Sequence, residues 1–232
     1  MITILIPLYR GVTHLDFTGP HQFLSTIPDA HVIVASLDGA PIVSHGLTFA
    51  NLTDLETIEH CDVLCVPGGL GCIPAMENER FLQAIRRLAG RANYITSVCT
   101  GSLILGAAGV LKGRRAACHW AWREMLTSFE AIPEDGRVVR DGHIITGGGV
   151  TAGIDFALIL IAELWGDEAA QSVQLLLEYA PSPPSDAGLP ETAPSRVREA
   201  VLNRMADALE DAHRRVDIVA RATLHRFLEA PG

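Results

Sequence analysis

Cys99 stands where a predicted buried strand meets a predicted helix, and such a position suits a nucleophile. Residues 94–98 are mostly apolar and β-favouring, whereas the small residues Thr100-Gly101-Ser102 follow the cysteine. A side chain on a sharp strand-to-helix turn is lifted clear of the sheet and faces the free N–H groups of the first helical turn. These groups and the helix dipole favour a thiolate, so the sequence predicts a lowered pKa and a nucleophilic role for Cys99. The alternative is a small buried cysteine, because free cysteine is among the most buried residue types.

Two further segments carry groups that a cysteine nucleophile needs, a proton carrier and an anion site. Asp16 follows the first predicted strand and is the best candidate for the proton carrier, although an aspartate that caps a helix fits the same position. The loop Pro67-Gly68-Gly69 follows another buried strand, and the backbone N–H groups of Gly69, Leu70 and Thr100 are candidates to hold water or a developing anion. The loop matches neither GxGxxG nor GK[ST], so nucleotide binding is not favoured.

Other cysteine and histidine residues give weaker signals. Cys61, Cys65 and Cys72 lack the CxxC spacing of zinc ribbons and no paired histidines follow them, so no metal and no other cofactor is expected. His119 stands alone on a later segment, and we interpret it as structural. The chain has 5 cysteines, each in or beside an apolar segment, which suits a reducing compartment better than a disulfide framework.

Strands alternate with helices along most of the chain, as in the βαβ units of a parallel sheet. The pattern predicts strands at 2–8, 31–37, 42–44, 47–50, 62–66 and 94–98, a hairpin at 137–140 and 143–146, and helices at 17–27, 77–88, 101–109, 120–128, 152–165 and 167–179. This order predicts a flavodoxin-like three-layer α/β sandwich with a mostly parallel sheet. Ligands bind at the carboxyl ends of the strands in such sheets, so the loops 7–16, 67–71, 99–101 and 146–149 are expected to meet at one edge.

Length and charge limit the number of domains and the kinds of partner. The 232 residues predict one domain, in which 181–232 is a proline-marked C-terminal extension that packs on the body or on a dimer partner. The formal charge of -9, without any basic run, argues against nucleic-acid and membrane partners. No signal peptide and no long apolar stretch is visible, so the protein is expected to be cytoplasmic.

Four motifs together resemble the ThiJ/PfpI group of the class I glutamine amidotransferase-like superfamily. They are Asp16-Phe17-Thr18-Gly19-Pro20, Val66-Pro67-Gly68-Gly69, Ser97-Val98-Cys99-Thr100-Gly101-Ser102 and the run from Thr146 to Asp155. The resemblance covers residues 1 to about 180. Within the group it extends to the bacterial isonitrile hydratases, through Tyr179-Ala180-Pro181-Ser182-Pro183-Pro184 and Asp186-Ala187-Gly188.

The resemblance implies a homodimeric enzyme that hydrates an isonitrile, R–N≡C, to an N-substituted formamide. Cys99 would form a thioimidate, Asp16 would donate the proton, and Thr100, Gly69 and Leu70 would bind water or the developing anion. Amidase- and protease-like members place a histidine directly after the nucleophile or elsewhere in the site, whereas Thr100 follows it here, and hydration of an isonitrile has no leaving amine to protonate. Two alternatives remain: a glyoxalase- or deglycase-like enzyme, which usually carries Glu in place of Asp16, and a ligand-sensing module of the kind found in transcription regulators.

Overall fold

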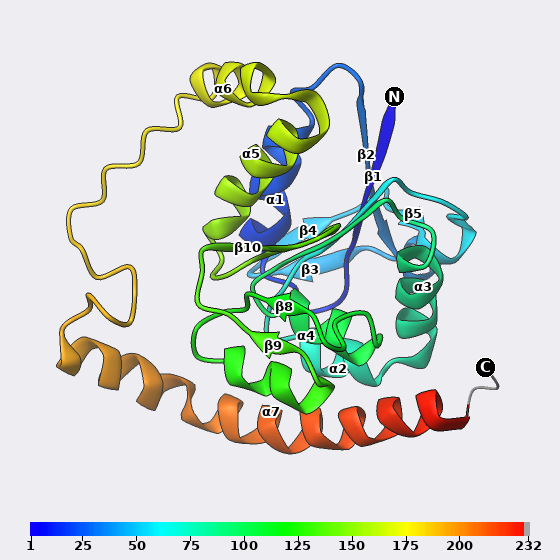
Figure 1. Cartoon of the computed structure of the whole chain (residues 1–232), viewed down its shortest axis with the longest axis vertical. Coiled ribbons are helices and arrows are strands. Elements are labelled where there is room, and N and C mark those ends of the chain that lie inside the picture. The colour runs from blue at the N-terminus through cyan, green and yellow to red at the C-terminus, as the bar shows by residue number, and fades with distance from the viewer. Residues whose placement is uncertain (230–232) are drawn as a thin grey trace.

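A seven-stranded sheet forms the centre of the molecule in a computed structural model that describes residues 1–229, with side chains as far as residue 225 (Figure 1). Its strand order is β10-β11-β7-β6-β1-β2-β5, and all neighbouring pairs are parallel except β10 with β11. The strands are β1 (Ile2–Pro7), β2 (Ala30–Ser36), β5 (Thr53–Asp54), β6 (Val63–Val66), β7 (Tyr94–Val98), β10 (Val138–Asp141) and β11 (Ile144–Gly147). The predicted mostly parallel α/β architecture is confirmed.

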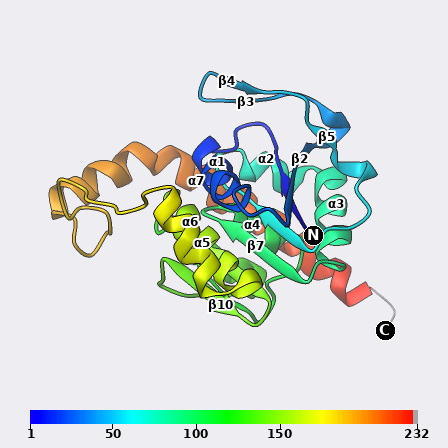
Figure 2. The same cartoon turned by 90° about the horizontal axis from the view of Figure 1, so that it is seen from above.

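Short elements lie outside the central sheet. The hairpin of β3 (Ile42–Ser44) and β4 (Leu47–Phe49) reaches away from the body, as Figure 2 shows. A second small sheet pairs β8 (Arg115–Ala116) with β9 (Ile132–Pro133) in parallel. The 3-10 helices are η1 (Leu37–Gly39), η2 (Leu55–Thr57) and η3 (Arg123–Phe129).

Helices cover both faces of the sheet, because its strands are apolar on both sides. On one face α1 (His14–Leu24) packs against α5 (Ala152–Trp165), which also contacts α6 (Asp167–Leu176). On the other face α4 (Gly101–Ala107) lies against β6 and β7, beside α2 (Cys72–Glu77) and α3 (Glu79–Ala89). The chain leaves β1 toward β2 and then returns to β6 on the opposite side, so the strand order reverses between β1 and β6.

Two predicted helices differ from the structure. The helix expected at 77–88 is α3, which begins at Glu79 because Asn78 has an extended backbone and its side chain accepts the Phe81 N–H at 3.2 Å; the separate helix α2 before it was not expected. The helix expected at 120–128 is the 3-10 helix η3, which ends at Glu130 in the left-handed region with φ +56°.

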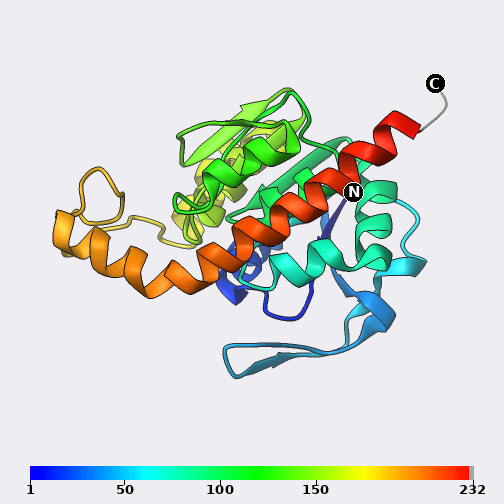
Figure 3. The same cartoon turned by 90° about the horizontal axis from the view of Figure 1, so that it is seen from below.

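The C-terminal extension ends in one long helix, α7 (Ser195–Glu229), which crosses the outside of α2, α4 and η3 (Figure 3). Ala212, Val216 and Ala220, spaced by four residues, are buried in this contact. Arg215 pairs with Glu77 at 2.7 and 2.5 Å. The first half of α7 extends beyond the body and exposes an apolar stripe of Val197, Val201 and Leu202. No helix in the described part of the chain is long and apolar enough to span a bilayer.

Candidate active site

The strands that carry the predicted site residues end side by side. Ser97 of β7 pairs with Val66 of β6 on one side and with Thr146 of β11 on the other. The Cys99 N–H then donates to the carbonyl oxygen of Gly147 at 3.0 Å. The predicted meeting of the strand ends at one sheet edge is therefore confirmed, and it lies at the reversal of strand order, where doubly wound folds bind ligands.

Cys99 occupies a sharp turn between β7 and α4. Its φ of +58° lies in the left-handed region, which costs a residue with a Cβ about 1–3 kcal/mol. The turn is tight because Gly101 lies directly against the Val66 carbonyl, where no Cβ would fit. The side chain is 4% exposed, and the structure gives the strand-to-helix elbow that the sequence predicts.

Asp16 is fully buried and is held by the loop after β6. It is the third residue of α1, whose N-cap is Thr13, so Asp16 is not the helix cap that the sequence left as an alternative. Its Oδ2 accepts the Gly68 N–H at 2.9 Å, and the Gly68 carbonyl accepts the Thr13 N–H at 2.8 Å. A Cβ on Gly68 would lie 2.5 Å from the Thr100 N and 2.8 Å from Asp16 Oδ2, so only glycine permits this approach.

The Thr100 hydroxyl both accepts a hydrogen bond from the backbone of Gly69 and donates one to it. The Gly69 N–H donates to Thr100 Oγ1 at 2.8 Å, and the Thr100 hydroxyl donates to the Gly69 carbonyl at 3.0 Å. One prediction therefore needs correction, since the Gly69 N–H is already used and is not free to hold an anion. The N–H groups of Leu70 and Thr100 remain candidates for that role.

The surroundings of Asp16 favour its protonated form. Burial raises the pKa of Asp16 from 3.8 to about 7, while the Gly68 N–H and the Cys99 thiol lower it by smaller amounts. Within the described residues, Asp16 Oδ1 is buried without a hydrogen-bond partner. A proton on Oδ1 is thus free to be donated to a bound molecule.

The lowered pKa predicted for Cys99 is wrong. Burial raises the pKa of the Cys99 thiol well above its usual value, and the nearby Asp16 carboxylate raises it further. The Thr100 N–H acts in the opposite direction, as expected at a helix N-terminus, but its effect is smaller. The loss of solvent therefore raises the pKa of Cys99 more than the helix N-terminus lowers it. Protonation of Asp16 removes the negative charge that would repel a Cys99 thiolate.

We expect iodoacetamide to modify Cys99 before the other cysteines, and to modify it faster in Asp16→Asn than in the wild type near pH 7.5. Cys61, Cys65 and Cys72 have no exposed surface, whereas the asparagine removes the charge that opposes a thiolate at Cys99. Peptide mapping by mass spectrometry over time measures both rates. Earlier labelling of Cys118, which is 3% exposed, or an unchanged rate in the variant would contradict this expectation.

Tyr9, Ser102 and His119 complete the surroundings of the elbow. The Tyr9 hydroxyl donates to the Pro67 carbonyl at 2.8 Å, and the Ser102 hydroxyl donates to the Ala117 carbonyl at 2.6 Å. His119 Nδ1 accepts the Ala121 N–H at 3.3 Å, and burial lowers the pKa of His119. Sequence reasoning missed Tyr9 and Ser102, because an aromatic residue after a strand and a serine in a helix equally fit packing positions.

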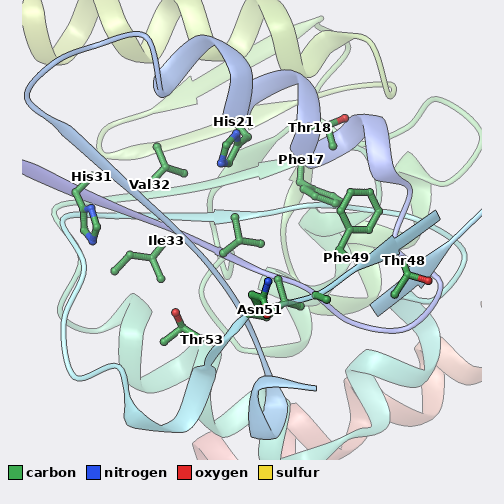
Figure 4. A pocket seen from close by; sticks show the side chains of 13 residues that line it. Phe17, Thr18, His21, His31, Val32, Ile33, Thr48, Phe49, Asn51 and Thr53 are labelled. Carbon is green, nitrogen blue, oxygen red and sulfur yellow. The ribbon is translucent and has the colours of Figure 1, made fainter. Parts of the chain in front are cut away.

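Two cavities flank the site. One, of about 650 Å³, lies between α1, β2 and residues 48–53, and Phe17, which follows Asp16, packs there against Phe49 with ring centroids 4.8 Å apart (Figure 4). The other, of about 440 Å³, is lined by Cys118, Trp120 and Gly148 and by residues 188–191 of the extension. Neither is lined by Asp16 or Cys99, so both are neighbours of the reactive groups and do not contain them.

Comparison with known proteins assigns the chain to a family. The model of the DJ-1/PfpI family matches residues 2–163. The chain belongs to the DJ-1/PfpI family. The predicted ThiJ/PfpI resemblance is thereby confirmed.

Relatives within the DJ-1/PfpI family include enzymes and regulators. An isonitrile hydratase from Pseudomonas putida is 50% identical over 216 residues, which are 93% of this chain and 93% of that protein. The crystal structure of a ThiJ/PfpI family protein from Pseudomonas syringae has a TM-score of 0.89 and 40% identity, and the match covers 94% of this chain and 90% of the other. A helix-turn-helix transcriptional regulator from Pseudomonas aeruginosa is 34% identical, but the match covers only 60% of this chain and 42% of the regulator.

Proposed function

We propose that this member of the DJ-1/PfpI family is an isonitrile hydratase, which converts R–N≡C and water into an N-substituted formamide. The observation that carries the proposal is the pairing of Cys99 with a buried Asp16 whose pKa is raised to about 7 and whose Oδ1 has no partner among the described residues. The 50% identity to an isonitrile hydratase along 93% of both chains supports the same activity.

The first half of the proposed reaction forms a bond between Cys99 and the terminal isonitrile carbon. The sulfur attacks that carbon as the Asp16 proton is transferred to it, and the product is the thioimidate R–N=CH–S–Cys99. An aspartic acid serves this step only while it is protonated, which the burial of Asp16 favours. The Thr100 N–H, which faces the sulfur, stabilises its negative charge before attack.

The second half releases the formamide. Water adds to the thioimidate carbon, and one of its protons passes to the nitrogen. The other proton passes to the Asp16 carboxylate as collapse of the tetrahedral adduct forms the C=O bond and breaks the C–S bond. The products are R–NH–CHO and the Cys99 thiolate, with Asp16 protonated again, so each cycle consumes one isonitrile and one water. We assign the orientation of that water to Leu70 N–H and to the unpartnered Asp16 Oδ1.

The direct test is turnover of a simple alkyl isonitrile by the purified protein. Cyclohexyl isonitrile is supplied, and NMR follows the formyl proton of the product while infrared absorption follows the loss of the N≡C stretch. Labelled water, H₂¹⁸O, must place its oxygen in the formamide. An absence of formamide above the rate of a heat-inactivated sample would reject the proposed function.

We further propose that the protein is a cytoplasmic homodimer. The exposed stripe of Val197, Val201 and Leu202 lies on the part of α7 that extends beyond the body. Apolar side chains left exposed in this way support a contact with a second subunit. The formal charge of -9 supports the absence of nucleic-acid and anionic-membrane partners.

We expect sedimentation at micromolar concentration to give twice the 24.9 kDa mass of the chain. Val201→Glu places a charge on the exposed stripe and should weaken the dimer, because burial of an unpaired charge is costly. A wild-type mass of 24.9 kDa under these conditions would contradict the proposal.

A further inference from the structure

One peptide unit links two side chains at the site. The carbonyl oxygen of Pro67 accepts the Tyr9 hydroxyl at 2.8 Å, and the N–H of Gly68 donates to Asp16 Oδ2 at 2.9 Å. Both groups belong to the planar Pro67–Gly68 amide, so the position of its oxygen fixes the direction of its N–H. Tyr9 is thus connected to Asp16 through a single rigid unit.

We propose that Tyr9 is a positioning residue for Asp16, which it orients and whose pKa it lowers by holding and polarising the Pro67–Gly68 peptide. The proposal rests on the proposed function only in giving Asp16 the role of proton donor. Tyr9 itself does not touch the reacting atoms.

The loop needs such a hold, because its next peptide is anchored separately. Both polar groups of the Gly68–Gly69 peptide are bound. Its carbonyl oxygen accepts the Thr13 N–H, and its N–H donates to Thr100 Oγ1. In the described part of the chain, the Pro67–Gly68 peptide has hydrogen bonds only to Tyr9 and Asp16. Without the Tyr9 hydroxyl, the hydrogen bond to Asp16 would be the only one left to hold this peptide among the described residues, so the peptide could no longer fix the orientation of Asp16.

Tyr9 is suited to a fixed donor role. It is 7% exposed, and its ring packs edge-on against Phe81 with centroids 5.6 Å apart. Burial raises the pKa of Tyr9 well above its usual value, and the negative forms of Cys72, Asp16 and Cys99 raise it further. The hydroxyl therefore keeps its proton over the whole working range of pH.

The other titratable groups that face Asp16 do not obscure a change in the pKa of Asp16. Besides Tyr9, they are the thiols of Cys99, Cys65 and Cys118, which lie on three other segments. Burial raises the pKa of each of these thiols, so they are neutral where Asp16 titrates. A change in the Asp16 pKa then reflects chiefly its solvation and the Gly68 N–H.

Removal of the Tyr9 hydroxyl is expected to change the pKa of Asp16 in one direction, upward. A polarised amide is a better N–H donor, and a hydrogen bond to the carboxylate favours the ionised form. Tyr9→Phe should therefore raise the pKa of Asp16 by at least about 0.3 unit, a small fraction of the shift that full burial produces. We also expect kcat to fall roughly three- to tenfold, because the carboxyl is held less firmly in line with the substrate.

The experiment measures the rate of Cys99 alkylation by iodoacetamide from pH 5.5 to 9 in wild type, Tyr9→Phe, Tyr94→Phe and Tyr9→Phe/Asp16→Asn. Tyr94→Phe is the control, because it likewise removes a tyrosine hydroxyl that donates a hydrogen bond, here to the Glu163 carboxylate at 2.7 Å, away from the site. The Asp16 ionisation produces an inflection in the rate, since its charge opposes the thiolate. We expect the inflection to move to higher pH in Tyr9→Phe, to stay in place in Tyr94→Phe, and to be lost from the double variant.

An inflection that is unchanged in Tyr9→Phe, or that moves equally in Tyr94→Phe, would overturn the role of Tyr9. An inflection that persists in the double variant would overturn its assignment to Asp16. These readings need no isonitrile, so a protein without hydratase activity would reject the proposed function and still test Tyr9. Urea unfolding of each variant confirms that the compared proteins are folded.

Discussion

Cys99→Ala is expected to abolish formamide production, because the proposed covalent route through the thioimidate disappears with the sulfur. Alanine meets the same left-handed backbone cost as cysteine at φ +58° and removes a single buried atom, so the variant should remain folded. NMR detection of the formyl proton after overnight incubation gives a sensitive upper limit for the remaining rate.

The matched control is Cys118→Ala, which removes another buried thiol near the elbow. This control should retain most of the wild-type turnover, since Cys118 has no part in the proposed reaction. Turnover by Cys99→Ala within tenfold of the wild-type rate would exclude Cys99 as the nucleophile.

Asp16→Asn is expected to reduce isonitrile turnover at least about a hundredfold, because an amide cannot make the proton transfer proposed for Asp16, and such transfers contribute about 10²–10⁴ in rate. The asparagine side chain can still accept the Gly68 N–H that now binds Oδ2. Initial rates over a range of substrate concentrations will separate the effect on kcat from that on KM. Near-normal activity in Asp16→Asn, with none in Cys99→Ala, would show that the proton comes from another source.

The same variant should also change the dependence of stability on pH. Burial raises the pKa of Asp16 from 3.8 to about 7, so the folded state binds this proton more tightly than the unfolded state. Wild-type stability therefore falls as the pH rises through this interval, and the loss is complete above the folded-state pKa. Asn has no proton to lose, so between pH 5 and 8 its free energy of unfolding should decline less, by on the order of 2–3 kcal/mol at 1.36 kcal/mol per pKa unit. Urea denaturation at both pH values measures the difference.

The placement of Asp16, Gly68 and Cys99 together could be predicted from the sequence, because it depends on the order of strands alone. Apolar runs that alternate with helices predict a parallel sheet, and a parallel sheet brings the ends of its strands to one edge. The residue types at those ends, a carboxylate, a pair of glycines and a thiol, then indicate the chemistry.

Hydrogen-bond partners and solvation could not be predicted in this way. The sequence does not show that Thr100 Oγ1 takes the Gly69 N–H, because that contact depends on the final approach of two loops. The pKa of Cys99 was mispredicted for a similar reason, since a helix terminus is visible in the sequence but the depth of burial is not. Helix α2 was not predicted, because its six residues include Pro74 and directly follow a glycine-rich loop.

The crowding around Gly68 and Gly101 limits how substrate range can be changed by mutagenesis. A Cβ at either position would meet backbone atoms, of Thr100 and of Val66 respectively, which cannot turn aside as a side chain can. Libraries directed at these loops should therefore return mostly unfolded proteins, whatever the selection. Thr18 and Trp120 instead line the two flanking cavities, so substitutions there change the walls of those cavities and leave the backbone contacts of Gly68 and Gly101 intact.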